Sequence, residues 1–291
     1  MRIALAQIVS SEDRDRNLAR VLQAMDDAAA AGADLVVFPE VVLDRFFPAK
    51  KGSDPVGTKD AAAGSVGELC KTGARRLAET IPGPIADRVA AKAAEHGMVT
   101  VFNMYERDGE RFYDTSPVFD ADGTLLGVTR MVHITDYEGF YEQDYYDPGD
   151  TGAPVYDTRV GKIGVAICYD RHYPEYMRAL ALAGAELVVI PQAGALGEWP
   201  EGLYEAEVRT AAFQNGYFVA LCNRVGVEET LTFAGESFVV DPDGRVLVSG
   251  ATLEEDLVVA DLDLGACAGS TARRLFLRDR RPELYADWMG A

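Results

Sequence analysis

The sequence lacks the features by which proteins bind polyanions or cross membranes. Lys and Arg number 28 against 47 Asp and Glu, the net charge is −19, and no basic cluster interleaved with aromatics interrupts this excess. Such a chain repels nucleic acid and anionic membrane surfaces. No apolar run approaches the roughly 20 residues that span a bilayer. The apolar residues 3–9 give way to the charged residues 12–16, so they indicate a first strand and not a signal peptide. We expect no nucleic-acid partner and no membrane partner.

Cysteine is also scarce. The chain has four cysteines, and their spacing matches neither a disulfide framework nor a metal site: Cys70, Cys168, Cys222 and Cys267. This usage is typical of a reducing compartment, so we expect a cytoplasmic protein. We also expect no metal and no cofactor.

What the chain does have is an alternation of strand and helix patterns. Its 291 residues are 48% hydrophobic, which is enough for a large core. Apolar periodicity predicts two strand–helix–strand units and two hairpins, and therefore an α/β fold with mixed sheets. The units comprise residues 3–9, 18–29 and 35–38, then 163–167, 174–183 and 187–190; a helix at 203–215 and a strand at 217–222 follow, and the hairpins comprise 112–132 and 237–248. No linker divides the chain, so we expect one domain over residues 1–291. Residues 44–80 show no clear hydrophobic periodicity, which predicts an irregular excursion of the chain near the mouth of a site.

Cys168 lies where an apolar strand ends, and Pro174 opens a helix six residues later. The amide dipoles of that turn and helix favour a thiolate over a thiol, so the position favours a catalytic nucleophile. The alternative is a small core cysteine, because free cysteine is among the most buried residue types.

Glu40 follows the strand at residues 35–38 in the same way. The carboxyl ends of strands in open α/β sheets form the crevice where ligands bind, so we expect Glu40 and Cys168 at one place. A carboxylate beside a thiol can take its proton and later activate water against the thioester. Taken alone, a Glu after a strand is more often a surface residue.

Several motifs extend this pair along the chain. They are, in order, Phe38-Pro39-Glu40; Tyr141-Glu142 ahead of residues 145–150; residues 161–175 around Cys168; Asn223-Arg224-Val225-Gly226; residues 233–241; and residues 280–285. This ordered set resembles the nitrilase, or carbon-nitrogen hydrolase, superfamily over nearly the whole chain. Cys168-Tyr169-Asp170 with the following Tyr173-Pro174-Glu175 is similar to the branch of amidases and N-carbamoyl-amide hydrolases.

The resemblance implies a fold, a reaction and site residues. The implied fold is a two-sheet αββα sandwich that pairs as a dimer, and the implied reaction is thiol-dependent hydrolysis of a small amide or N-carbamoyl compound. Cys168 would be the nucleophile, Glu40 the base and Glu142 a second carboxylate that positions the first. The backbone N–H of Tyr169 would be an oxyanion donor.

The chain departs from this family at one position. The family places a catalytic lysine in an Arg-Lys pair shortly before a histidine, whereas residues 129–134 here read Thr-Arg-Met-Val-His-Ile, with Met131 in the lysine's place. No lysine occurs between Lys92 and Lys162, so realignment does not supply one. Loss of one oxyanion donor typically costs about 10²–10³ in rate, or roughly 3–4 kcal/mol. Two carboxylates also lose their compensating cation, so we expect at least one of them to have a raised pKa.

Three residues are candidates to replace the lysine. His133 would share a strand face with Met131, because side chains at spacing two point the same way. Arg171 and His172 follow the nucleophile directly. Each also has a structural interpretation: a structural histidine for His133, and a helix-terminal or intersubunit contact for the other two.

The sequence says less about substrate and assembly. We expect residues 192–199 to line the pocket, with Gln192, Ala193 and Trp199 as the substrate contacts. The alternative is an ordinary loop, which would show the same sequence features. Acidic residues there could hold a cationic substrate tail or be solvated helix-start charges: Glu198, Glu201 and Glu205. The carboxyl-terminal residues 273–288 resemble the family segment that crosses to a partner subunit, which predicts a homodimer.

Three functions stay open. The chain is a Cys168-dependent hydrolase, a non-catalytic binding or regulatory protein with the family pocket, or an enzyme in which the thiol adds to carbon without the usual hydrolysis. Retention of Glu40, Glu142 and Cys168 together favours an active thiol. Met131, natural or introduced, favours the other two.

Overall fold

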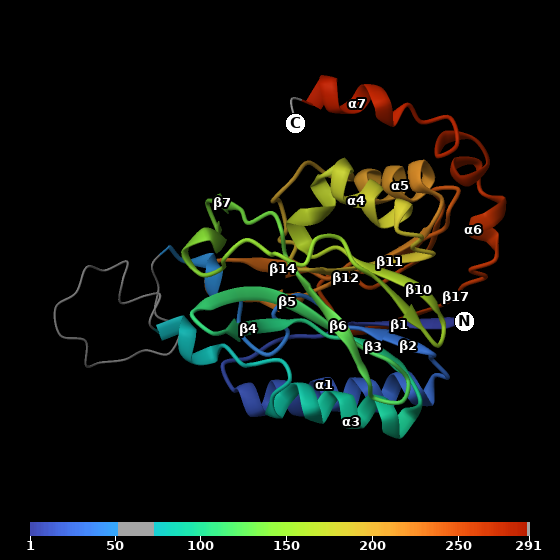
Figure 1. The fold of residues 1–291 in the computed structure, drawn as a ribbon. Coiled ribbons are helices and arrows are strands. Elements are labelled where there is room, and N and C mark those ends of the chain that lie inside the picture. The colour runs from blue at the N-terminus through green and yellow to red at the C-terminus, as the bar shows by residue number, and fades with distance from the viewer. Residues whose placement is uncertain (52–72, 290–291) are drawn as a thin grey trace.

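The computed structural model describes residues 1–51 and 73–289. Two sheets pack face to face, and a pair of helices covers the outer side of each, as Figure 1 shows. The αββα sandwich implied by the resemblance is therefore confirmed. Most of the expected excursion at residues 44–80 lies outside the described residues.

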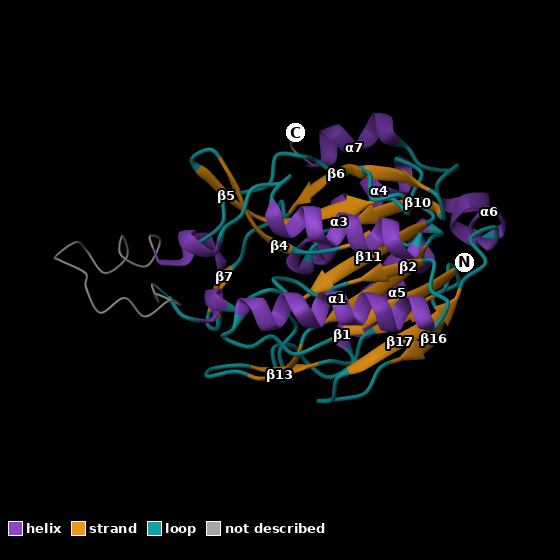
Figure 2. Ribbon diagram, turned by 90° about the horizontal axis from the view of Figure 1, so that it is seen from below, coloured by secondary structure: helices purple, strands orange, loops and turns teal. Residues whose placement is uncertain are grey.

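The first sheet contains both parallel and antiparallel strands. Its order is β17-β1-β2-β3-β5-β4, with β6 paired to β5; strands β1, β2 and β3 are parallel and the other pairs are antiparallel. Its outer helices are α1 (Arg14–Ala30) and α3 (Pro84–His96), which lie side by side across the strands in Figure 2. The strands are β1 (Arg2–Gln7), β2 (Leu35–Val37), β3 (Val99–Val101), β4 (Met104–Asp108), β5 (Arg111–Phe119), β6 (Leu125–Arg130) and β17 (Asp256–Asp261).

The second sheet repeats the design with the order β16-β15-β12-β11-β10-β9. Its three central strands are parallel and its outer pairs antiparallel. The helices α4 (Pro174–Leu182) and α5 (Leu203–Asn215) cover its outer face. The strands are β9 (Val155–Thr158), β10 (Gly161–Val165), β11 (Leu187–Gln192), β12 (Phe218–Asn223), β15 (Phe238–Val240) and β16 (Val246–Ser249).

Shorter elements connect and follow the sheets. Two small hairpins pair β7 (Asp136–Tyr137) with β8 (Phe140–Tyr141) and β13 (Val225–Val227) with β14 (Thr232–Ala234). Single helical turns are η1 (Phe47–Ala49), η2 (Arg75–Leu77), η3 (Glu142–Asp144), η4 (Cys168–His172) and η5 (Ala272–Phe276). After α6 (Ala266–Gly269), the chain ends in α7 (Pro282–Met289), which lies on the outer side of α4 and α5 in Figure 1.

Alternation along the strands explains the layered core. In β11, Leu187 and Val189 face the layer between the sheets, whereas Val188 and Ile190 face α4 and α5. A strand buried on both faces reads as a continuous apolar run, which is why residues 187–190 show no polar alternation. Strand β11 thus contributes apolar side chains to both layers of the core.

Local signals set the helix boundaries. The Asp13 carboxylate accepts a hydrogen bond from the Arg16 N–H at 3.0 Å and caps α1. Pro174 opens α4, where its missing N–H costs nothing. Gly216 ends α5 with φ 68°, and a Cβ there would collide with Ser270, so the position requires glycine.

The predicted strands, helices and hairpins are confirmed within a few residues, but one inference drawn from them is wrong. Strand β6 ends at Arg130, so Met131 and His133 lie beyond it. The period-two argument that put both side chains on one face therefore does not apply. Helix α3 and strand β3 were not predicted, and no described helix is long and apolar enough to span a membrane.

Candidate active site

Cys168 is displayed by a strained turn. It follows the end of β10 and begins the helical turn η4, with a φ of +42°. A non-glycine residue in this region costs of order 1–3 kcal/mol and persists only where its surroundings hold it. The strain turns the thiol away from the path of the strand, as a nucleophile at the end of a strand requires.

Two side chains hold this turn. The Gln192 Nε2 donates to Cys168 Sγ at 3.1 Å, and the Arg171 Nη1 donates to the Cys168 carbonyl and to Gln192 Oε1, each at 3.0 Å. Gln192, the last residue of β11, is fully buried. It thus contacts the thiol directly, whereas the sequence had predicted it only as a pocket residue.

The structure brings Glu40, Glu142 and Cys168 together. One ligating atom from each lies within 4.8 Å of the other two, and all three side chains are buried. Glu40 follows β2, and Glu142 begins η3. Three segments far apart in sequence therefore meet at one point.

Asp114 is a fourth member that the sequence did not single out. It lies on β5, and the charge of Glu40 is the second cause, after burial, of its raised pKa. The Asn103 Nδ2 donates to Asp114 Oδ1 at 2.7 Å. A signal was available, because Asp114 is a charged residue in the middle of a strand of otherwise apolar and small residues.

Several oxygen atoms around the thiol are buried without a hydrogen-bond partner among the described residues. They are both carboxylate oxygens of Glu40, one oxygen each of Asp114 and Glu142, and the hydroxyl of Tyr146. Tyr146 is buried close enough to the three acids that their charges raise its pKa further, after burial itself. Buried polar groups are almost always paired in proteins, so this concentration of unpaired oxygens makes the cluster the candidate site.

Burial and mutual repulsion raise the pKa of these acids. Burial first, and the charge of Glu142 second, raises the pKa of Glu40 to about 8. Burial likewise raises the pKa of Asp114 and of Glu142 well above the usual range, with Glu40 and Asp114 as the respective second causes. The prediction that at least one carboxylate has a raised pKa is confirmed.

The pKa of Cys168 also moves upward. Burial is the first cause, and the charges of Glu40 and Glu142 follow; Arg171 offsets them in part. The expectation that amide dipoles favour a thiolate is therefore wrong for the resting site, because desolvation and two acids outweigh them.

The cations nearby are engaged with backbone atoms. Arg224 donates to the carbonyls of Glu40 and Val41 at 2.9 and 2.7 Å, and its other nitrogen pairs with Glu228. Among the described residues, no Lys or Arg forms an ion pair with the acids Glu40, Asp114 and Glu142. Met131, in the place that the family gives to lysine, is fully buried in the core cluster that contains Cys168.

The candidate substitutes for the lysine bond elsewhere. His133 Nδ1 lies 2.7 Å from Asp170 Oδ1, and its ring stacks on Tyr173 with centroids 3.5 Å apart. His172 Nδ1 lies 2.7 Å from a Glu207 oxygen. Arg171 holds the turn, as described above.

The remaining predicted pocket residues lie around these groups. Ala193 is buried in a cluster with Phe46, Phe140 and Phe233. The rings of Trp199 and Tyr137 are 5.9 Å apart, and those of Tyr169 and Tyr137 are 6.4 Å apart.

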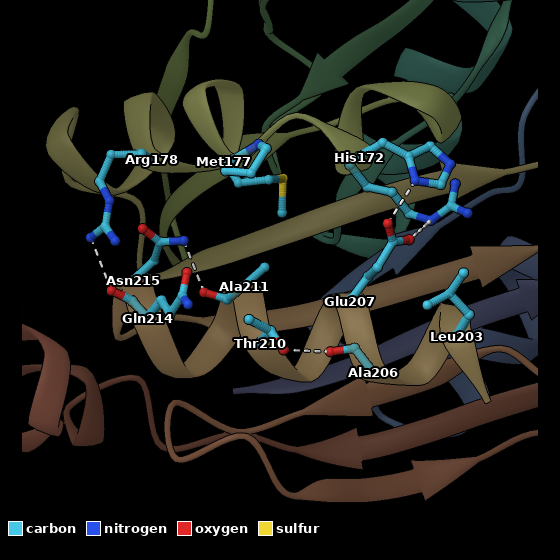
Figure 3. A pocket seen from close by; sticks show the side chains of 12 residues that line it. His172, Met177, Arg178, Leu203, Ala206, Glu207, Thr210, Ala211, Gln214 and Asn215 are labelled. Atoms are coloured by element: carbon cyan, nitrogen blue, oxygen red, sulfur yellow. Dashed lines mark hydrogen bonds and ion pairs between the residues drawn. The ribbon is translucent and has the colours of Figure 1, made fainter. Parts of the chain in front are cut away.

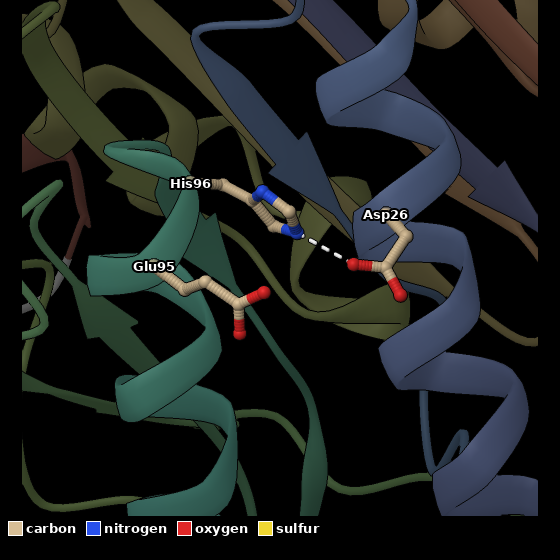
Figure 4. Close-up of side chains that lie close together, drawn as sticks. All are labelled: Asp26, Glu95 and His96. Carbon is tan, nitrogen blue, oxygen red and sulfur yellow. Dashed lines mark hydrogen bonds and ion pairs between the residues drawn. The ribbon is translucent and has the colours of Figure 1, made fainter.

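Two other features are not part of this site. A groove of about 320 Å³ between α4 and α5 is drawn in Figure 3; Glu207 reaches across it to His172, and the thiol does not line it. Figure 4 shows Asp26, Glu95 and His96 between α1 and α3. Lys92 already pairs with Asp26 at 2.6 Å, so that cluster is a neutralised surface contact.

Comparison with known proteins places the chain among hydrolases. A family model described as carbon-nitrogen hydrolase matches residues 2–271. The N-carbamoylputrescine amidase of Arabidopsis thaliana is 30% identical over 97% of this chain and 93% of its own. A solved carbon-nitrogen hydrolase from Helicobacter pylori superposes with a TM-score of 0.86 at 28% identity, covering 99% of this chain and 98% of that one. A variant of an amidase from Nesterenkonia, solved with the acetamide moiety of fluoroacetamide added covalently at its active-site cysteine, is 26% identical with a TM-score of 0.77, covering 99% and 96%.

Proposed function

We propose, because this chain belongs to the carbon-nitrogen hydrolase family, that it hydrolyses a small amide or N-carbamoyl compound through a covalent intermediate on Cys168. The observation that carries this proposal is the meeting of Cys168, Glu40 and Glu142 within 4.8 Å. A structural core cysteine would not need two buried acids beside it, since each buried acid is costly.

The proposed reaction moves one proton between two groups. Glu40 accepts the thiol proton as sulfur bonds to the substrate carbon, and returns it to the departing nitrogen as the C–N bond breaks. Water then attacks the intermediate with Glu40 as base again. Because its pKa is about 8, Glu40 is suited to both accepting and returning a proton near neutral pH.

Other predicted residues keep positioning roles. Glu142 repels the Glu40 charge, and Gln192 orients the sulfur by its 3.1 Å hydrogen bond. The backbone N–H of Tyr169 is the proposed oxyanion donor. His133 and His172 are paired with Asp170 and Glu207, which supports structural roles for them.

A non-catalytic binding protein is the second candidate. The buried Met131 favours it, because no cation is available from that position to stabilise an oxyanion. The raised pKa of the Cys168 thiol points the same way.

The test is intact-protein mass spectrometry combined with ammonia release on a panel of short amides and N-carbamoyl amines. We expect an adduct and turnover with the parent chain and a loss of about 10⁴-fold or more in Cys168→Ala. Cys222→Ala is the matched control, since that thiol bonds the Val37 carbonyl within the core. Turnover that survives Cys168→Ala would exclude the thiol mechanism, and ammonia release only after Met131→Lys would support the non-catalytic candidate.

A homodimer is also proposed, from the carboxyl-terminal residues 273–288. Leu275, Phe276 and Trp288 are exposed there, Trp288 by 70%. Sedimentation of the chain, whose mass is 31.5 kDa, should give about twice that value. A monomer at micromolar concentration would contradict this proposal. The cytoplasmic location stays a prediction.

A further inference from the structure

The site holds three buried acids for which the described residues provide no ion-pair partner. Glu40, Asp114 and Glu142 are each fully buried, and each has at least one oxygen without a partner among the described residues. Tyr146 beside them is only 4% exposed, and its hydroxyl also has no hydrogen-bond partner among the described residues. Unsatisfied buried acids cost several kcal/mol, so their arrangement is suited to a ligand that satisfies them.

That ligand must supply what the acids lack. They lack an ion-pair partner and several N–H donors among the described residues, and one oxygen of Glu40, one oxygen of Glu142 and the Cys168 sulfur lie within 4.8 Å of one another. A guanidinium group is planar, always charged, and carries N–H donors in a fork that matches carboxylates.

The shape of the expected substrate narrows the choice. The N-carbamoyl group of an alkylurea and an alkylguanidinium group are both planar, three-substituted carbons of nearly the same size. They differ in that one N–H₂⁺ replaces the carbonyl oxygen. A site that fits the planar N-carbamoyl group, but has buried acids and no lysine beside it, would therefore prefer the alkylguanidinium group.

The departure at Met131 agrees with this choice. Attack on a carbonyl creates an oxyanion, which needs a cation or donor. Attack of sulfur on a guanidinium carbon removes positive charge and creates no oxyanion, so a lysine there would only repel the substrate. Met131 supplies a buried apolar wall instead.

We propose that the Cys168 site binds and hydrolyses an alkylguanidinium or amidinium compound, held by Glu40, Asp114 and Glu142. The covalent part of this inference rests on the thiol mechanism proposed above; the binding part does not.

The reaction balances without a further reactant. The S–H proton passes to Glu40 as the S–C bond forms, and Glu40 returns it to one nitrogen, which leaves as ammonia when the C–N bond breaks. Water then adds to the carbon of the cationic thioether-bound intermediate while Glu40 takes its proton. The C–S bond breaks as Glu40 returns that proton to sulfur, and the remaining hydroxyl proton passes to ammonia. The sum is alkylguanidinium plus water giving alkylurea plus ammonium.

The first experiment compares two isosteric probes on one protein. Calorimetry with the full-length Cys168→Ala chain should show methylguanidinium binding at least about tenfold more tightly than methylurea, the difference expected for a charged hydrogen bond. Cation binding lowers the pKa of the protonated acids, so titration in two buffers of different ionisation enthalpy should show protons released with methylguanidinium only. Equal affinity for the two probes, or no proton release, would overturn the proposal.

Variants locate the binding to these acids. Asp114→Asn and Glu142→Gln should each weaken methylguanidinium binding about tenfold or more, and by a larger factor than they weaken methylurea binding. Glu110→Gln is the matched control, because it removes one charge from the exposed tip of the same β4–β5 hairpin. Met131→Lys should abolish the preference. Thermal melting of each variant checks folding, and the probe comparison on Cys168→Ala stands even if one variant fails to fold.

Two further results separate the possibilities. Zinc binding at one ion per chain that excludes methylguanidinium would identify the acids and thiol as metal ligands and overturn this inference. If Cys168-dependent ammonia release occurs from amides and ureas while methylguanidinium neither binds preferentially nor reacts, the inference is wrong and the proposed function stands. If methylguanidinium binds with proton release but no compound yields ammonia, the binding inference stands and the proposed function is wrong.

Discussion

Two clusters of charge lie next to each other at the end of β6 and treat charge in opposite ways; one joins Arg130 of β6 to Glu106 and Asp108 of β4, and the other contains Asp114 of β5. Arg130, the last residue of β6, donates to Glu106 at 2.7 and 2.9 Å, to Asp108 at 2.8 Å and to Asp150 at 2.9 Å. The next residue is Met131, and on that side the acids have no such partner among the described residues. One step along the chain separates a fully paired cluster from an unpaired one.

The difference separates stability from function. Thr115 donates to Glu106 at 2.6 Å, so even the neighbour of Asp114 belongs to the paired cluster. A paired buried ion is held in place by its partners, whereas an unpaired acid destabilises the fold and persists where a ligand requires it. Substitutions on the two sides should therefore have opposite effects on the free energy of unfolding.

The largest effect on the free energy of unfolding is expected from removing the cation of the paired cluster. Arg130→Met would replace the cation of the paired cluster with an apolar side chain, as Met131 replaces the family's lysine beside the unpaired acids. It would leave Glu106 buried without its cation. We expect a loss of about 3–5 kcal/mol in the free energy of unfolding, measured by urea denaturation. Arg107→Met, at an exposed position of β4, should change it by less than about 1 kcal/mol. A small loss from Arg130→Met would show that the cluster contributes little.

The pH dependence of stability should be set by the unpaired cluster. The pKa of Glu40 is raised from 4.5 to about 8 in the folded chain, so the folded state binds more protons than the unfolded state between these values. Stability should therefore fall as pH rises from about 4.5 to 8, by about 3–5 kcal/mol from this group. Melting curves of the parent and Glu40→Gln should diverge with rising pH, the variant being the more stable near pH 8. Parallel curves would mean that Glu40 is not protonated.

Local sequence patterns were enough to predict much of the fold and part of the candidate site. Periodicity predicted strand–helix–strand units, hairpins and mixed sheets, whereas the two-sheet sandwich followed from the family resemblance. Glu40 and Cys168 do meet at strand ends as expected, but the strands that they follow belong to different sheets, β2 to the first and β10 to the second. Asp114 was not predicted as a site residue, because its environment depends on which strand pairs with β5, and strand pairing is not a local property of the sequence. The direction of the Cys168 pKa was predicted incorrectly for a similar reason: the dipole effect is visible in sequence, but the desolvation that exceeds it comes from the packing of distant segments.

A smaller effect, of opposite sign to Arg130→Met, should come from Asp114→Asn. This change removes a buried acid whose pKa is raised well above the usual range by burial and by Glu40. Asparagine keeps the hydrogen-bonding shape without the ionisation cost, so we expect the free energy of unfolding at pH 8 to rise by about 1–2 kcal/mol. The gain should shrink at pH 5, because a raised pKa makes the acid less costly to bury as pH falls. Destabilisation at both pH values would indicate that the hydrogen bond from Asn103 Nδ2 requires the carboxylate.

The smallest effect should come from Met131→Leu, and it decides what Met131 does. If the side chain serves only as a buried apolar wall, a volume-conserving exchange should cost less than about 1.5 kcal/mol and leave ligand binding unchanged. Met131→Lys has similar length but places an ammonium in a fully buried position; there it can pair with the acids, so its cost to stability should be smaller than that of a lysine in a dry core. A thermal melt of both variants at pH 8 tests this directly. If Met131→Lys unfolds the chain while Met131→Leu does not, the side chain at position 131 does not reach the acids, and the unpaired cluster would have to take its cation from elsewhere.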